Sequence, residues 1–232
     1  KAGTTIDEDS NIEAGWFIIL DGANNGALTN FRLSGIRVDG SRSTVTGFDS
    51  LNTCVGIVGY QDSVFDNVQV DNCTVHSILQ GSGFYSYAGG IRFINCVSYD
   101  NDQHGGACSR LTTFGDAEKV VEWTNFTAHD NGQQASPNND GCGLDVGHYC
   151  RTIVTNLNSY WNGQGMKFSI GTEYLQVRGA RLAYNLMNGF TDTDTVGTAI
   201  LDLDGIVTHN NGALGFRLVS GSSVRIGSIN SY

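Results

Sequence analysis

The sequence is short of proline, of positive charge and of long apolar runs. It has one Pro and 31 Gly among 232 residues, and 13 Lys and Arg against 23 Asp and Glu, which gives a net charge of −10. That charge argues against nucleic acid or an anionic membrane surface as a partner. No apolar run approaches the roughly 18 residues that a membrane span needs, so the sequence predicts no membrane insertion.

What the chain has instead is a short motif that recurs. Each copy opens with Asn, closes on Asn, and is followed by a Gly-bearing turn and an alternating segment. The clear copies are 95–101, 125–131 and 156–162, and fainter copies close at Asn185 and Asn210. Short strands with Gly and Asn at the corners are typical of a solenoid, in which each coil buries its apolar face against the next. We predict an all-β fold, a right-handed single-stranded parallel β-helix of about eight coils.

The repeat runs through the whole chain, so we expect 1–232 to form a single parallel β-helix domain. Residues 224–228 have the pattern of a further coil that is just starting. We therefore expect a segment of a longer solenoid. Exposed strand edges at its ends would invite flanking domains or association as a homotrimer.

Six cysteines leave two interpretations open. Cys73 and Cys96 occupy the same position of the motif, and Cys108 and Cys142 look like a similar pair. They are either small apolar residues stacked in neighbouring coils or disulfide partners, because adjacent strands bring Cα atoms within bridging range. Cys142 and Cys150 flank a turn and are the best candidates for a local bridge.

Two phrases carry a resemblance to a known superfamily. Residues 30–42, with Leu-Ser-Gly-Ile-Arg-Val-Asp-Gly-Ser-Arg at their end, resemble the strand and turn near the start of pectate-lyase-like β-helices, and 97–105 resemble the coils of alginate C5-epimerase modules. That superfamily also includes phage tailspikes. The resemblance covers 28–220 and implies a β-helix that engages carbohydrate. The epimerases' catalytic Asp-Pro-His-Glu has its nearest counterpart in 143–148, where the Pro and the Glu are missing.

Strand alternation places a set of charged side chains on one outer face. The residues expected there are Arg110, Asp145, His148, Lys167 and Arg217, with His104 at the corner of the face. Aligning the flanking glycines puts Asp145 beside Ser169 and diagonal to Lys167. Cations around one carboxylate are suited to an acidic polysaccharide. Tyr160 and Trp161 either stack on its sugar rings or pack against the next corner of the solenoid.

The chemistry that this face could support is β-elimination or C5-epimerisation of a uronate. Both reactions need a cation that neutralises the sugar carboxylate, a base for the C5 proton and an acid on the other side. Lys167 or Arg110 would neutralise, His148 would be the base and Asp145 would orient it, with His104 as a further catalytic candidate. Arg110, Arg217, Tyr160 and Trp161 are assigned to substrate binding.

Two further alternatives stay open. An outward Asp beside a Lys on a solenoid is also what a solvated ion pair looks like, and a non-catalytic glycan-binding or structural β-helix, such as a tailspike segment, accounts for the same pattern. No cofactor is required by the chemistry, although the acidic residues Asp192, Asp194, Asp202 and Asp204 keep a Ca²⁺ site open. Either function places the protein outside the cell, at a cell surface or on a virion.

Overall fold

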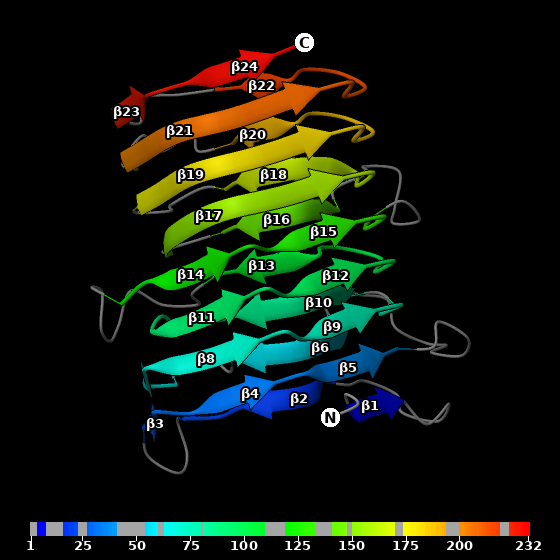
Figure 1. Cartoon of the computed structure of the whole chain (residues 1–232), viewed down its shortest axis with the longest axis vertical. Coiled ribbons are helices and arrows are strands. Elements are labelled where there is room, and N and C mark those ends of the chain that lie inside the picture. The colour runs from blue at the N-terminus through cyan, green and yellow to red at the C-terminus, as the bar shows by residue number, and fades with distance from the viewer. Residues whose placement is uncertain are drawn as a thin grey trace.

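The chain folds into stacked coils of parallel β-strands. The computed structural model describes residues 4–7, 16–22, 27–40, 54–59, 63–79, 81–109, 119–132, 141–147, 150–169, 174–193, 200–218 and 223–232. All regular elements in these ranges are strands, and Figure 1 shows the coils rising from the N-terminus at the bottom to the C-terminus at the top. The predicted parallel β-helix is confirmed. This part of the chain contains no helix that could span a membrane.

Two large sheets form the walls of the coils. The smaller has eight strands, in the order β2 (Trp16–Leu20), β6 (Cys54–Gly59), β10 (Gly81–Ser86), β13 (Gly106–Cys108), β16 (Cys142–Val146), β18 (Gln164–Phe168), β20 (Phe190–Asp192) and β22 (Phe216–Arg217). A separate two-stranded sheet pairs β3 (Leu28–Thr29) with β7 (Phe65–Asp66). In the eight-stranded sheet, each strand pairs in parallel with the strand of the next coil.

The larger sheet has 14 strands. They are β1 (Thr4–Asp7), β4 (Arg32–Ser34), β5 (Ile36–Asp39), β8 (Val68–Asp71), β9 (Thr74–His76), β11 (Ile91–Ile94), β12 (Val97–Tyr99), β14 (Val121–Thr124), β15 (Thr127–His129), β17 (Arg151–Tyr160), β19 (Tyr174–Ala183), β21 (Ile200–His209), β23 (Ser223–Ile226) and β24 (Ile229–Ser231). Lower coils contribute two short strands each, and β17, β19 and β21 span the same width as single strands.

Alternation along each strand fills the space between the sheets with apolar side chains. Phe84, Phe93, Trp123 and Phe168 are fully buried, and the rings of Phe93 and Trp123 stack at 4.3 Å. Because no coil could bury this surface alone, the stacking of coils is what stabilises the fold.

The opening Asn of each repeat forms an exposed ladder. Asn72, Asn95, Asn125 and Asn156 all adopt a positive φ, which Asn tolerates better than most residues. From Asn95 onward, each side chain donates to the preceding one, with Nδ2 to Oδ1 distances of 2.9 Å from Asn125 to Asn95 and 3.1 Å from Asn156 to Asn125. This ladder marks the bend in the larger sheet.

The closing Asn forms a second ladder, which is buried. Asn131 donates through Nδ2 to Asn162 Oδ1 at 2.9 Å and accepts from Asn101 Nδ2 at 2.8 Å. The same Oδ1 atoms accept backbone N–H groups at the corner, at 3.2 Å from Asn101 and 3.0 Å from Asn131. The last rung is Asn211, not the predicted Asn210, because Asn185 donates to Asn211 Oδ1.

The described cysteines are free thiols. Cys73 and Cys96 stack in neighbouring coils, as the register of the strands beside them requires, and both are fully buried. Cys142 and Cys150 are not bridged, so that interpretation is wrong. Cys108 lies opposite Val146, and therefore does not stack on Cys142 as the repeat suggested. The side chain of Cys54 lies outside the described residues.

Candidate active site

Asp145 and Lys167 lie directly opposite each other on β16 and β18 of the smaller sheet. The predicted register, which put Asp145 beside Ser169, is therefore wrong by two residues. In the preceding coil, Ala107 is the register partner of Asp145. A shift of two residues leaves each side chain on the same face of a strand, so the predicted face is unaffected.

The register follows from close backbone packing at a glycine near the start of each strand, such as Gly143 in β16 and Gly165 in β18. A Cβ on Gly143 would lie 1.9 Å from Ser159 Oγ and 2.7 Å from the carbonyl oxygen of Gly165, its counterpart in the next coil. A Cβ on Gly165 would likewise lie 2.4 Å from the carbonyl oxygen of Gly189. These leading glycines, and not the flanking ones used in the sequence alignment, are therefore the positions that stack.

One outward column of the sheet runs through the site. Its members are Tyr85, Ala107, Asp145, Lys167, Thr191 and Arg217, each the register partner of the next. Arg217 thus lies in the Lys167 column, as predicted. Strand spacing puts the backbones of these two cations roughly 10 Å apart along the solenoid.

The column has a depression at Ala107, whose side chain is shorter than those of its neighbours Tyr85 and Asp145. A cavity of about 220 Å³ opens there, and its walls include Tyr85, His104, Ser109, Asp145, Lys167 and Ser169. The small Ala107 side chain leaves room above the sheet, while the neighbouring coils project their longer side chains around it. Three of the predicted residues, His104, Asp145 and Lys167, therefore meet in one cavity.

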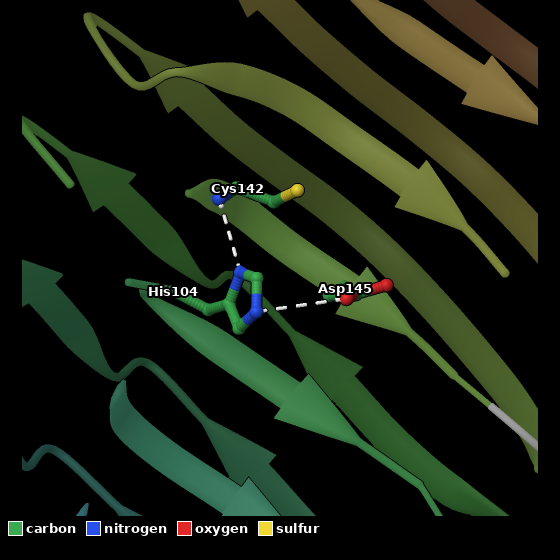
Figure 2. Close-up of side chains that lie close together, drawn as sticks. All are labelled: His104, Cys142 and Asp145. Carbon is green, nitrogen blue, oxygen red and sulfur yellow. Dashed lines mark hydrogen bonds and ion pairs between the residues drawn. The ribbon is translucent and has the colours of Figure 1, made fainter. Parts of the chain in front are cut away.

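His104 and Asp145 form an oriented pair (Figure 2). The backbone N–H of Cys142 donates to His104 Nδ1 at 3.1 Å, and His104 Nε2 lies 3.6 Å from Asp145 Oδ2. In neutral imidazole one nitrogen accepts and the other carries hydrogen, so this geometry places the hydrogen on Nε2, facing the carboxylate. Ser169 donates from Oγ to Asp145 Oδ1 at 3.0 Å. Asp145 is thus held from both sides.

Tyr85 brings a protonated phenol to the same cavity. Burial raises its pKa well above the usual value, and the neighbouring Tyr87 and the Asp145 carboxylate raise it further. Its ring stacks on that of Tyr87 with centroids 4.3 Å apart. A hydroxyl that stays protonated beside a carboxylate is suited to donating a proton or a hydrogen bond.

Cys142 is the third possible metal ligand near this pair. Ligand atoms of His104, Cys142 and Asp145 lie within 4.8 Å of one another. However, His104 Nδ1 already accepts a backbone N–H, and Figure 2 shows the Cys142 sulfur directed away from the imidazole. The three groups do not converge on one point, and the arrangement favours an acid–base pair over a metal centre.

The acidic residues considered for Ca²⁺ are distributed over both sheets. Asp192 is buried in β20, whereas Asp202 and Asp204 lie in β21 of the other large sheet. Asp202 is paired with Arg178, and Asp204 accepts a hydrogen bond from Ser228. Asp194 lies outside the described residues, and a Ca²⁺ site stays a prediction.

Of the other predicted site residues, two lie outside the described part of the chain and two lie on another part of the surface. His148 and Arg110 fall outside the described residues. Tyr160 belongs to a ladder of stacked rings at the ends of strands in the larger sheet, and Trp161 follows it at the corner. Neither lines the cavity around Asp145. Their role as sugar-binding residues therefore concerns a second surface.

The sequence analysis missed Tyr85 and its partner Tyr87. Both belong to the alternating stretch 81–87, and Tyr85 has the same outward position in its strand as Asp145 has in β16. An alignment of the leading glycines, Gly83 with Gly143, would have placed Tyr85 and Asp145 in one column.

Comparison with known proteins supports the architecture. The sequence matches no protein-family model and no curated protein sequence. Among solved structures, the A-module of mannuronan C-5 epimerase AlgE4 from Azotobacter vinelandii superposes with a TM-score of 0.65 at 18% identity, covering 88% of this chain and 51% of that chain. XylC in complex with xylose superposes with a TM-score of 0.50 at 10% identity, covering 87% of this chain and 36% of that chain. This chain thus spans about half of the epimerase module, and the fold that it shares with that module is the parallel β-helix.

Proposed function

We propose that the protein is a carbohydrate-active β-helix that engages an acidic polysaccharide at the cavity around Asp145 and acts on its uronate residues as a lyase or C5-epimerase. The observation that carries the proposal is the meeting of Tyr85, His104, Asp145 and Lys167 in that cavity. A cation, an imidazole–carboxylate pair and a protonated phenol are the groups that proton transfer next to a carboxylate requires.

Lys167 supplies the positive charge. The C5 proton of a uronate is weakly acidic because the carbanion that forms is stabilised only by the adjacent carboxylate. An ammonium group on that carboxylate lowers the energy of the carbanion, and it acts most strongly in a partly enclosed site. Lys167 is half-buried and opposite Asp145 in the sheet, so it can hold the sugar with C5 over the cavity.

The His104–Asp145 pair accepts the C5 proton. Asp145 is held by Ser169 and faces His104 Nε2, so its carboxylate is oriented before substrate arrives. The C5 proton is taken up by an oxygen of Asp145, a carboxylate that His104 orients from Nε2. His148, which the sequence analysis predicted as the base, lies outside the described residues.

Tyr85 supplies the proton on the other side. In elimination, its hydroxyl protonates the oxygen that leaves from C4. In epimerisation, the same hydroxyl returns a proton to C5 from the face opposite the base. The hydroxyl is protonated at neutral pH, as both roles require.

A glycan-binding β-helix without turnover is the second candidate. It is favoured by the absence of the Asp-Pro-His-Glu motif from 143–148. In that case Lys167 and Arg217 would hold successive carboxylates along the column, and the cavity would select the sugar without breaking a bond.

Incubation with mannuronan, alginate and pectate tests both candidates. Ultraviolet absorbance reports the unsaturated product of elimination, and proton NMR of mannuronan reports epimerisation, which absorbance misses. We expect turnover that is lost in Asp145→Ala and His104→Ala, with polymer binding retained. Binding without turnover in the unaltered protein would support the second candidate. Turnover that survives both substitutions would exclude this site.

A further inference from the structure

A single corner position recurs in six coils with the same unusual backbone. It is the residue after the last strand residue of the larger sheet, and its φ lies in the left-handed region each time. The occupants are Ser77 (φ 59°), Asp100 (58°), Asp130 (56°), Trp161 (55°), Tyr184 (55°) and Asn210 (53°). Asn and Asp adopt this conformation more readily than other side-chain-bearing residues do, because their short polar groups bond locally.

Trp161 and Tyr184 break that rule in two consecutive coils. A bulky aromatic residue in the left-handed region is strained, and such strain persists only where the surroundings or a function maintain it. Burial provides only part of a compensating gain, because Trp161 is 50% exposed and Tyr184 is 44% exposed. The strain therefore points to a use for these rings on the surface.

The two rings are also presented differently from those below them. His76, Tyr99, His129 and Tyr160 form a ladder in which each ring face covers the next, with interplanar angles of 9°, 0° and 8°. The ladder stops at Tyr160, because its register partner in the next coil is Ala183. Ring surface that would otherwise be enclosed in the ladder is thus available at this corner.

Trp161 and Tyr184 meet their neighbours mostly at an angle. Trp161 contacts Tyr160 with planes at 77°, Tyr184 contacts His209 at 84°, and their own centroids are 6.4 Å apart. A pair of exposed rings one coil apart has about the spacing of the coils themselves. Their planes are tilted by 47°, so the two rings form a bent apolar platform along the axis of the solenoid.

A cation borders the platform. Arg181 is exposed on the outer side of β19, and its Nε lies 3.3 Å from His209 Nε2. The charge of Arg181 also acts on Tyr160, whose pKa it lowers against the larger raising effect of burial. An acidic sugar carries an apolar C–H surface and a carboxylate. The aromatic rings suit the C–H surface, and the guanidinium suits the carboxylate.

We propose that Trp161, Tyr184 and Arg181 form a second carbohydrate-binding site, which holds two or more units of an acidic polysaccharide away from the cavity. The choice of an acidic polymer rests on the proposed function, whereas the site itself rests on the corner geometry. Bound there, a chain would be kept at high local concentration near the solenoid while its other segments visit the cavity.

The backbone at this corner provides an unusually sharp test. Trp161→Asn and Tyr184→Asn install the kind of residue that the other coils use, so the variants should unfold at the same temperature as the unaltered protein or higher. We expect affinity for alginate or pectate, measured by affinity electrophoresis and calorimetry, to fall by about tenfold in the double variant. Leu186→Asn is the matched control, because Leu186 is also 50% exposed but has no ring.

The outcomes separate this site from the cavity. Unchanged polymer affinity in the double variant would overturn the proposal, and so would a lower unfolding temperature, since it would give the rings a structural role. A change from oligomer to monomer by light scattering would also overturn it, because the rings would then pack against a second copy. If the cavity proves inactive, the double variant still loses polymer binding.

Discussion

His104 Nε2 lies 3.6 Å from Asp145 Oδ2, although the two residues belong to different coils. His104 is at the corner that precedes β13, and Asp145 is within β16 of the next coil. The backbone of Cys142 fixes the imidazole from its other nitrogen. An oriented pair of this kind requires that the two coils stack in one register only, and the predictions below test both that register and the pair's surroundings.

Lys167 should be essential for turnover because it is the cation opposite Asp145. We expect Lys167→Ala to lower kcat/KM on a uronate polymer by about 100-fold or more. Lys167→Arg should recover part of the loss, since it restores the charge with a different shape. Arg92→Ala is the control, because Arg92 contacts Asn67 in the larger sheet, away from the cavity. Equal losses in Lys167→Ala and Arg92→Ala would mean that only the overall charge matters.

Tyr85→Phe should remove the proton donor and leave the ring in place beside Tyr87. Turnover should fall, while binding of the polymer stays the same.

Burial raises the pKa of Tyr85 in the folded protein, whereas the phenol of the unfolded chain ionises near its usual value of about 10. Stability from this group is therefore complete below about pH 10 and is lost as the pH rises beyond it. Chemical denaturation at pH 9 to about 11 should show a shallower decline in Tyr85→Phe than in the unaltered protein.

The two asparagine ladders should differ sharply in their contribution to stability. Asn131→Ala leaves buried partners in two neighbouring coils without their hydrogen bonds, and we expect it to lower the free energy of unfolding by about 2–4 kcal/mol. Asn125 stands in the exposed ladder with φ 52°, and Asn125→Gly should change stability by about 1 kcal/mol or less. Urea denaturation of both variants measures the difference. Similar losses would show that the buried ladder has no special role.

Gly143→Ala tests the origin of the register. The added Cβ would lie 1.9 Å from Ser159 Oγ and 2.7 Å from the Gly165 carbonyl oxygen. Because that carbonyl belongs to the backbone of the next coil, we expect a loss of about 3 kcal/mol or more and a displaced Asp145. Gly35→Ala is the comparison, since nothing lies within 4 Å of its added Cβ although its φ is +69°. A mild effect at Gly143 would show that other contacts fix the register.

Asp71 should contribute to the acid sensitivity of the fold. Arg32 holds the pKa of this carboxyl below its usual value, with Nε to Oδ1 at 2.9 Å, and Asp71 is almost fully buried. A lowered pKa in the folded state means that the stabilisation is present above the unfolded value of about 4 and is lost as the pH falls through the folded value. Asp71→Asn should be less stable at neutral pH and should lose less on acidification. An identical acid profile in both proteins would contradict this assignment.

The sequence supported the fold because its signals are local and repeated. The Asn that opens and the Asn that closes each motif mark corners that the structure places in two stacked ladders. The outward side of β16 and β18 also followed from alternation, so Asp145 and Lys167 were placed on the correct face. Tyr85 was missed because nothing in its own strand distinguishes it from an ordinary surface residue.

The amino-acid sequence by itself determined that this chain stacks short strands, and it determined which side chains point away from the core, because the repeat and the alternation are encoded within each coil. Only the tertiary structure decided which side chains become neighbours. That choice depends on how closely the backbones of successive coils approach at glycines such as Gly143, a contact between distant residues that no single repeat contains.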